Sequence, residues 1–180
     1  MSTKVEATIE DLYRVHGKAE LVNGEIVLMP PTGDEPARAA GAVFVSLRLQ
    51  EGKAAGRAYS DNVGFRVHLP NRDSFSPDAG WFIGPSSGMK FLQGAPVFAV
   101  EVRSEHDYSA NAERALAAKR ADYFAAGTLV VWDVDLLSTE VIKSYNASNP
   151  EAPKIFRRGE TADAEPAVPS WRMSVDELFK

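Results

Sequence analysis

The stretch that decides the fold is Val97-Phe98-Ala99-Val100-Glu101-Val102-Arg103. Its apolar composition is typical of a buried strand, in which successive side chains point to opposite faces. Glu101 and Arg103 therefore share one face, while Phe98, Val100 and Val102 share the other. A carboxylate inside such a strand is costly unless it is paired or binds a cation. The stretch thus predicts a buried central strand with Glu101 as a functional acid.

Asp78 is the second informative acid. It follows a Ser-Pro pair and begins an apolar run that ends at Ile83, which predicts another strand. A glycine-rich loop, residues 84–94, connects this run to the strand of Glu101, so the two strands are expected to be neighbours. Paired carboxylates on neighbouring strands suit Mg²⁺ or Mn²⁺, hard cations that prefer oxygen ligands. The sequence therefore predicts a divalent-metal site at Asp78 and Glu101.

A lysine in the next helix points to the same site. A helix is expected over residues 110–126, and Gly127 ends it. At about 100° per residue, one stripe of this helix contains Ala112, Ala115, Leu116, Lys119 and Tyr123. Lys119 either extends past the rim to solvent or points at the carboxylates, where it could orient or deprotonate water and stabilise phosphate charge. Glu20, ahead of the Asn23-Gly24 dipeptide, is a candidate third acid.

The rest of the pattern predicts an α/β fold with a mixed sheet. Asn23-Gly24 favours a β-hairpin between residues 19–22 and 25–29, because both residues tolerate positive φ. Helices are expected from Thr8 to about Gly17, over residues 35–55 with a stop at Gly56, and from Ser174 onward. Further strands are expected at residues 63–69, 128–134, 139–145 and 155–156, with a turn-rich segment at 146–153. No linker divides the chain, so residues 1–180 are expected to form one domain.

Composition excludes several classes of protein. The chain has 180 residues and no cysteine, which excludes disulfides, zinc-thiolate sites and thiol nucleophiles and leaves the cytoplasm as the expected compartment. Its net charge of −5 argues against strong non-specific binding of nucleic acid, although a local basic patch stays possible. Met1–Asp11 lacks the apolar run of a signal peptide, and no segment is apolar for long enough to span a membrane. No membrane association is therefore expected.

Several motifs together resemble a known family. They are Glu20–Val27, Ser76–Asp78, Val100–Ser104, Lys119 with Tyr123, Ala126-Gly127 and Val131–Asp135. In order and spacing they are similar to the putative restriction-endonuclease family of the PD-(D/E)xK nuclease superfamily, over residues from about 8 to 145. The resemblance implies a restriction-endonuclease-like mixed sheet flanked by helices, with an N-terminal β-hairpin. It also implies a divalent metal, Mg²⁺ or Mn²⁺, held by Asp78, Glu101 and the backbone carbonyl of Val102.

One position departs from the superfamily pattern. The residue two after the acid is usually lysine there, and here it is Arg103, whose pKa is too high for a base. The resemblance implies that the lysine has moved to the helix, at Lys119. The expected function is metal-dependent endonucleolytic hydrolysis of DNA. Asp78 and Glu101 would bind the metal and Lys119 would place the water, while Glu20 would assist and Arg103 would contact phosphate or hold Glu101.

Other interpretations remain open. The acidic charge and Arg103 favour a catalytically degenerate domain for binding or oligomerisation, and the same acids would also suit hydrolysis of a small phosphoester. Residue by residue, Asp78 could cap a turn, Glu101 could pair with Arg103 or Arg66, and Lys119 and Glu20 could be ordinary surface side chains. A homodimer is expected, because two-fold pairing is the commonest assembly.

Overall fold

A six-stranded mixed sheet forms the centre of the computed structural model, which describes residues 6–180. Its strand order is β11-β10-β9-β8-β6-β3. The bounds are β3 (Arg57–Ser60), β6 (Ala79–Phe82), β8 (Phe98–Val102), β9 (Val130–Val134), β10 (Ile142–Asn146) and β11 (Asn149–Phe156). β8 runs parallel to β9 and antiparallel to β6. The predicted strand of Glu101 is therefore confirmed as an inner strand of this sheet.

A second sheet has five strands in the order β2-β1-β5-β4-β7. The bounds are β1 (Ala19–Val22), β2 (Glu25–Leu28), β4 (Phe65–Leu69), β5 (Arg72–Phe75) and β7 (Leu92–Gln93). The predicted N-terminal hairpin is confirmed: β1 pairs with β2, and Asn23 and Gly24 have φ values of 51° and 69°. This hairpin brings Glu20 into the same layer as β5.

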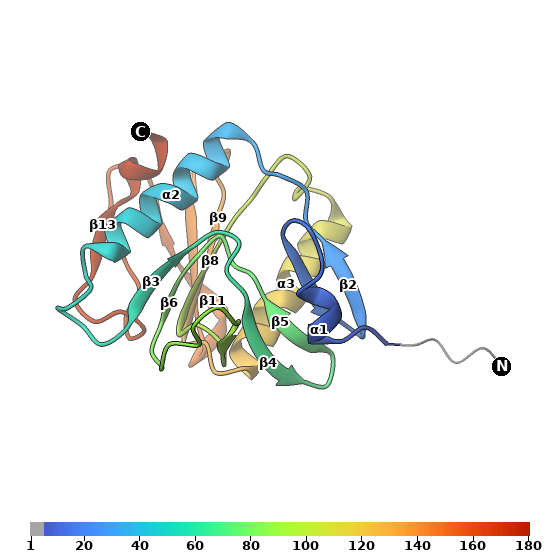
Figure 1. Ribbon diagram of the computed structural model, residues 1–180. Helices are drawn as coiled ribbons and strands as arrows, with labels where there is room; N and C mark the ends of the chain where they lie inside the picture. The colour runs from blue at the N-terminus through green and yellow to red at the C-terminus, as the bar shows by residue number, and fades with distance from the viewer. Residues whose placement is uncertain (1–5) are drawn as a thin grey trace.

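The remaining elements cover the two sheets (Figure 1). They are α1 (Ile9–Leu12), α2 (Asp34–Arg48), α3 (Ala110–Ala125), the two-stranded sheet of β12 (Thr161–Asp163) and β13 (Arg172–Ser174), and the short 3₁₀ helix η1 (Val175–Phe179). Among residues 6–180, none of the helices is long and apolar enough to cross a membrane. The first five residues of Met1–Asp11, where no signal-like run was found, lie outside the described residues.

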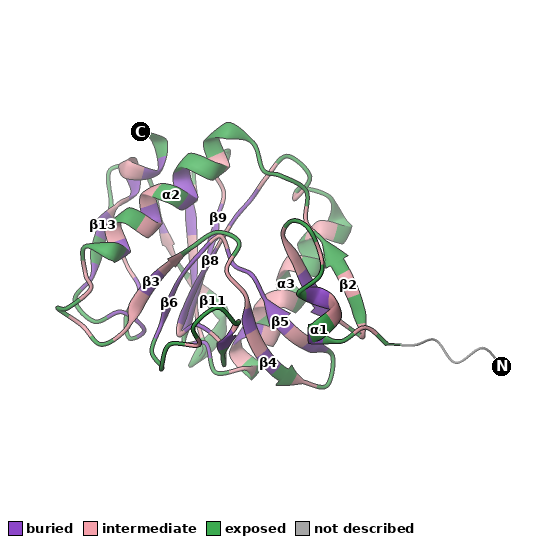
Figure 2. Ribbon diagram, in the orientation of Figure 1, coloured by how far each residue is buried: buried purple, intermediate pink, exposed green. Residues whose placement is uncertain are grey.

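β8 lies between two hydrophobic clusters, and its side chains alternate between the two faces as its sequence predicts. Phe98, Val100 and Val102 belong to the larger cluster, which packs against α2, Trp171 and the C-terminal segment. Ala99, on the opposite face, belongs to a cluster between the six-stranded sheet, the five-stranded sheet and α3. Buried residues accordingly concentrate in the strands between the covering layers (Figure 2). Glu101 shares the face of Ala99 and so points toward α3.

Two predicted elements have different bounds in the structure. The helix expected over residues 35–55 ends at Arg48, because the chain turns at Gly52, which has a φ of 80°, and the Glu51 carboxylate accepts the N–H of Ala58 at 2.8 Å. Most of the segment predicted as turn-rich, residues 146–153, belongs to β11. That strand tolerates Pro150 because it lies at the edge of its sheet.

The first helix is also shorter than predicted. α1 covers only Ile9–Leu12, although its predicted start is confirmed. The Thr8 hydroxyl accepts the Asp11 N–H, and the Asp11 carboxylate accepts the Thr8 N–H at 2.9 Å, which is a capping box.

Candidate functional site

Asp78 and Glu101 lie on adjacent strands, as expected. Asp78 immediately precedes β6, and its N–H donates to the Val100 carbonyl of β8 at 3.0 Å. Its Oδ2 accepts the N–H of Val102 at 2.8 Å. These two hydrogen bonds join Asp78 to β8 and fix its carboxylate beside Val102, the residue after Glu101.

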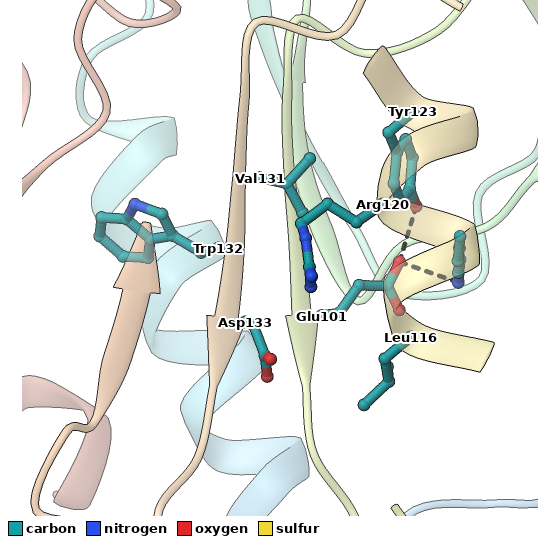
Figure 3. A pocket seen from close by; sticks show the side chains of 8 residues that line it. Glu101, Leu116, Arg120, Tyr123, Val131, Trp132 and Asp133 are labelled. Atoms are coloured by element: carbon teal, nitrogen blue, oxygen red, sulfur yellow. Dashed lines mark hydrogen bonds and ion pairs between the residues drawn. The ribbon is translucent and has the colours of Figure 1, made fainter. Parts of the chain in front are cut away.

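Glu101 points at α3, where it meets the predicted lysine. Its Oε1 lies 2.8 Å from the Lys119 Nζ and accepts the Tyr123 hydroxyl at 2.6 Å. Figure 3 shows Glu101 directed toward α3 and toward Tyr123, whereas Trp132 of β9 points to the other face of the sheet. Lys119 thus contacts the carboxylate instead of extending to solvent, and its side chain is only 14% exposed.

Glu20 lies on the far side of Lys119. Its Oε1 is 2.9 Å from the Lys119 Nζ and accepts the Ser76 N–H at 2.8 Å. Its Oε2 accepts the Arg72 Nη1 at 2.5 Å, and the Arg72 Nε donates to Asp122 of α3 at 2.8 Å. Glu20 is buried, which removes its interpretation as a surface acid. Glu20 therefore holds the Lys119 ammonium as a second carboxylate partner beside Glu101.

Charge and burial act differently on the groups around Lys119. Burial raises the pKa of Glu101; the Lys119 charge opposes this and the Asp78 charge adds to it, so the net pKa is above its ordinary value. Burial also disfavours the charge of Glu20, but Lys119 and Arg72 outweigh it and lower the pKa. Burial lowers the pKa of Lys119 less than Glu101 and Glu20 raise it. Lys119 is therefore an ammonium at neutral pH.

Lys18 is a site residue that our sequence analysis missed. Its Nζ lies 2.6 Å from Asp78 Oδ1 and 2.6 Å from Asp61 Oδ1. Burial lowers the pKa of Lys18, but the charges of Asp78 and Glu101 outweigh it and the net pKa is raised. The signal that could have found it is its position two residues before Glu20, since strand alternation puts both on one face.

Arg103 does not contact the acids of the site. Its Nε and Nη2 donate to Asp133 of β9 at 2.7 and 2.8 Å, and both Nη atoms reach Glu113 of α3. Glu101 instead has Lys119 as its ion-pair partner, so the suggested pairing with Arg103 or Arg66 is replaced. The Arg103 guanidinium joins β9 to α3 behind the site.

The acids of the site fit a divalent metal that takes few ligands from the protein. Among residues 6–180, no three His, Cys, Asp or Glu side chains are arranged around a common metal position. Two adjacent carboxylates nevertheless fit Mg²⁺, which keeps several waters and takes one or two carboxylates from a protein. The ion pairs around these acids form two groups: Lys18 with Asp61 and Asp78, and Arg72 and Lys119 with Glu20, Glu101 and Asp122. Fully ionised, these eight side chains carry a net charge of −2, which a divalent cation would neutralise.

A mixed sheet covered by helices, with acids on adjacent strands and a lysine on the covering helix, is a nuclease-like fold. Residues 8–176 match the family model Uma2, described as putative restriction endonuclease, and the chain belongs to this family. A search of curated proteins gives no match. A solved structure, a putative nuclease of DUF820 from Anabaena variabilis ATCC 29413, has a TM-score of 0.73 and 15% identity, and the match covers 96% of this chain and 97% of that chain. This likeness confirms the predicted fold.

Proposed function

We propose that this protein is a divalent-metal-dependent endonuclease that hydrolyses DNA phosphodiester bonds, with Mg²⁺ or Mn²⁺ as its cofactor. The observation that carries the proposal is the contact of Lys119 with Glu101 at 2.8 Å, beside a second carboxylate on the neighbouring strand. Two acids and a lysine would each be replaced at lower cost by apolar residues in a purely structural core. Membership of a family described as putative restriction endonuclease supports the same reaction.

Asp78, Glu101 and the Val102 carbonyl would hold the metal. The direction of that carbonyl follows from one hydrogen bond: the Arg103 N–H donates to Val134 of β9 at 2.9 Å. Because the peptide is planar and trans, the Val102 C=O points the opposite way, away from β9 and to the side of β6. When bound, the metal would polarise a phosphoryl oxygen and lower the pKa of a coordinated water.

Lys119 would act as a cation and not as a base. Its contacts with Glu101 and Glu20 keep it protonated, so it can orient a water or stabilise charge on the phosphate. The oxygens of Glu20 already bind Lys119, Arg72 and the Ser76 N–H, which favours a positioning role over direct assistance through a second metal. For Arg103, the contacts with Asp133 and Glu113 favour bracing of the strands over the expected phosphate contact.

The shape of the site argues against hydrolysis of a small phosphoester. A crevice lined by Glu101, Lys119, Tyr123 and Asp133 has a volume of only about 10 Å³. That volume is close to what one water needs. A phosphate group would therefore bind outside this crevice, as a phosphate of a polymer can.

Further parts of the proposal concern the whole protein. We propose that residues 1–180 act as one nuclease-like domain, because both faces of the six-stranded sheet are packed by the rest of the chain. A homodimer would present two sites to a duplex, and DNA as substrate would place the protein in the cytoplasm. Sedimentation equilibrium tests the dimer: it should give about twice the 19.6 kDa mass of one chain.

Cleavage of supercoiled and linear DNA tests the function. Purified protein should cut in Mg²⁺ or Mn²⁺ and should not cut in chelator. Glu101→Ala and Asp78→Ala should abolish cutting, because each removes a proposed metal ligand. Glu177→Gln, a half-exposed acid of η1 in the layer of α2, is the control and should cut normally. A well-folded wild-type protein that cuts no DNA with either metal would favour the degenerate binding domain instead.

A further inference from the structure

Lys18 occupies the position of a counter-ion at the outer carboxylate of the site. Its ammonium is equidistant from Asp78 and Asp61, at 2.6 Å from an Oδ1 atom of each. The Lys18 side chain is 14% exposed and that of Asp78 is 22% exposed, whereas Asp61, just after β3, is 50% exposed. Lys18 therefore links a carboxylate of the site to one at the surface.

The hydrogen bonds of Asp78 decide which of its oxygens can change partner. Oδ2 accepts the Val102 N–H, a contact that belongs to the junction of β6 and β8. Oδ1 is held by Lys18 alone among the described contacts. A cation bound by Asp78 would therefore compete with the Lys18 ammonium for Oδ1, since two positive groups on one oxygen repel each other strongly.

Asp61 offers Lys18 a second partner, whose Oδ1 also accepts the Asn62 N–H at 2.8 Å. If Lys18 moved wholly to Asp61, it would keep an ion pair while Asp78 Oδ1 turned to a metal. The net charge of −2 summed over the two groups of ion pairs already counts Lys18 as present. A divalent cation can thus be neutralised without sending Lys18 out to solvent.

We propose that Lys18 is the resident counter-ion of Asp78 in the metal-free protein and that metal binding transfers it to Asp61. Lys18 and Asp61 are then positioning residues that set the affinity of the site for a divalent cation. This inference rests on the proposed metal site at Asp78 and Glu101. Beyond that site, it assigns roles to Lys18 and Asp61, which need not touch the metal.

Mn²⁺ titration of the full-length protein, followed by the electron paramagnetic resonance of free Mn²⁺, tests the transfer without any measurement of activity. Lys18→Gln removes the competitor, so it should tighten Mn²⁺ binding by at least about tenfold. Asp61→Asn leaves Lys18 with Asp78 alone, so it should weaken binding by a similar factor. When Lys18→Gln and Asp61→Asn are combined, Asp61→Asn should change the Mn²⁺ affinity by less than about threefold. The reason is that no ammonium remains at position 18 for Asp61 to bind.

Two further variants serve as controls. Lys18→Arg keeps the charge and should bind Mn²⁺ within a few-fold of wild type, while Asp78→Asn should abolish binding. Circular dichroism melting verifies that each variant is folded; if Lys18→Gln is not, Lys18→Met, which also removes the charge, with and without Asp61→Asn repeats the comparison.

Weaker or unchanged binding in Lys18→Gln, or an equal effect of Asp61→Asn in both backgrounds, would overturn the transfer. In that case, Asp78-dependent binding by wild type would leave the proposed metal site standing. No Mn²⁺ binding by any variant would overturn both.

Discussion

At the scale of single residues, Glu101 and Glu20 share one lysine but respond to their surroundings in opposite directions. Both contact Lys119, at 2.8 and 2.9 Å. Glu20 has Arg72 as a second cation, whereas burial disfavours the charge of Glu101 and the charges of Asp78 and Glu20 add to this effect. The pKa of Glu20 is therefore lowered and that of Glu101 is raised. The ionised form of Glu101 is therefore disfavoured in the folded protein, and a bound cation would stabilise it. Such a shifted pKa is typical of a functional site.

Glu20→Gln should destabilise the protein by about 3 kcal/mol at neutral pH, since it leaves Arg72 and Lys119 with a neutral partner. Because the folded-state pKa of Glu20 lies below its ordinary value of 4.5, its stabilisation is present above that pH and is lost as the pH falls through the lower value. Urea unfolding in chelator at several pH values measures both effects. Equal stability of variant and wild type at pH 7 would contradict this account of Glu20.

For Glu101→Gln, the pH dependence of stability should have the opposite sign to that for Glu20→Gln. The pKa of Glu101 is raised above 4.5, so the folded state holds its proton more tightly than the unfolded state does. The stability of wild type relative to the Gln variant should therefore decrease as the pH rises above 4.5 in chelator. The same urea series detects this change. A Gln variant that loses as much stability as Glu20→Gln would show that Glu101 is a structural acid.

At the scale of elements, Arg103 ties β9 to α3. Arg103→Ala leaves the buried carboxylate of Asp133 without its cation, which should cost about 3 kcal/mol and lower Tm by roughly 10 °C. Glu113→Gln is the matched control: the Glu113 side chain is half exposed, so its loss should cost about 1 kcal/mol or less. Thermal melts compare the two variants. Equal losses of Tm in the two variants would contradict the role of Arg103 in joining β9 to α3. An unchanged Tm of Arg103→Ala with loss of DNA cleavage would favour a contact of Arg103 with phosphate.

Gly56 fixes the start of β3 against Trp81. Its φ is +121°, and a Cβ there would lie 2.2 Å from the Trp81 Nε1, which donates to the Ala55 carbonyl at 2.9 Å. Gly56→Ala should therefore cost about 2 kcal/mol or more. Gly41→Ala, at an open position of α2, is the control and should stabilise by up to about 1 kcal/mol. Chemical unfolding distinguishes them, and a neutral Gly56→Ala would contradict the close approach.

The elements show which features sequence patterns can predict. β8 and the hairpin follow from local rules, period-two alternation and the Asn23-Gly24 turn, and both were predicted. β11 was hidden because Pro150 and Pro153 argue against a strand unless its place at a sheet edge is known. Lys18 was missed for a similar reason: its partners, Asp61 and Asp78, lie far along the chain, and only the folded sheets bring the three together.

At the scale of the whole molecule, the site is assembled from both sheets and from α3. β1 supplies Glu20, the junction of β6 with β8 supplies Asp78 and Glu101, and α3 supplies Lys119. No single segment could hold this arrangement, so its charges depend on the packing of all three layers. The overall charge of −5, of which the site contributes −2, repels phosphate. A divalent cation would therefore serve the approach of DNA as well as its hydrolysis.

The most direct test is the position of Mn²⁺ in crystals of the protein, located by its anomalous scattering. The account predicts one peak between Asp78 and Glu101, within coordination distance of both carboxylates and of the Val102 carbonyl, with Lys18 moved onto Asp61. Glu101→Gln crystals treated identically should lose the peak. Saturating Mn²⁺ that leaves no peak there, with Lys18 still bound to Asp78, would contradict a metal-dependent site at these residues.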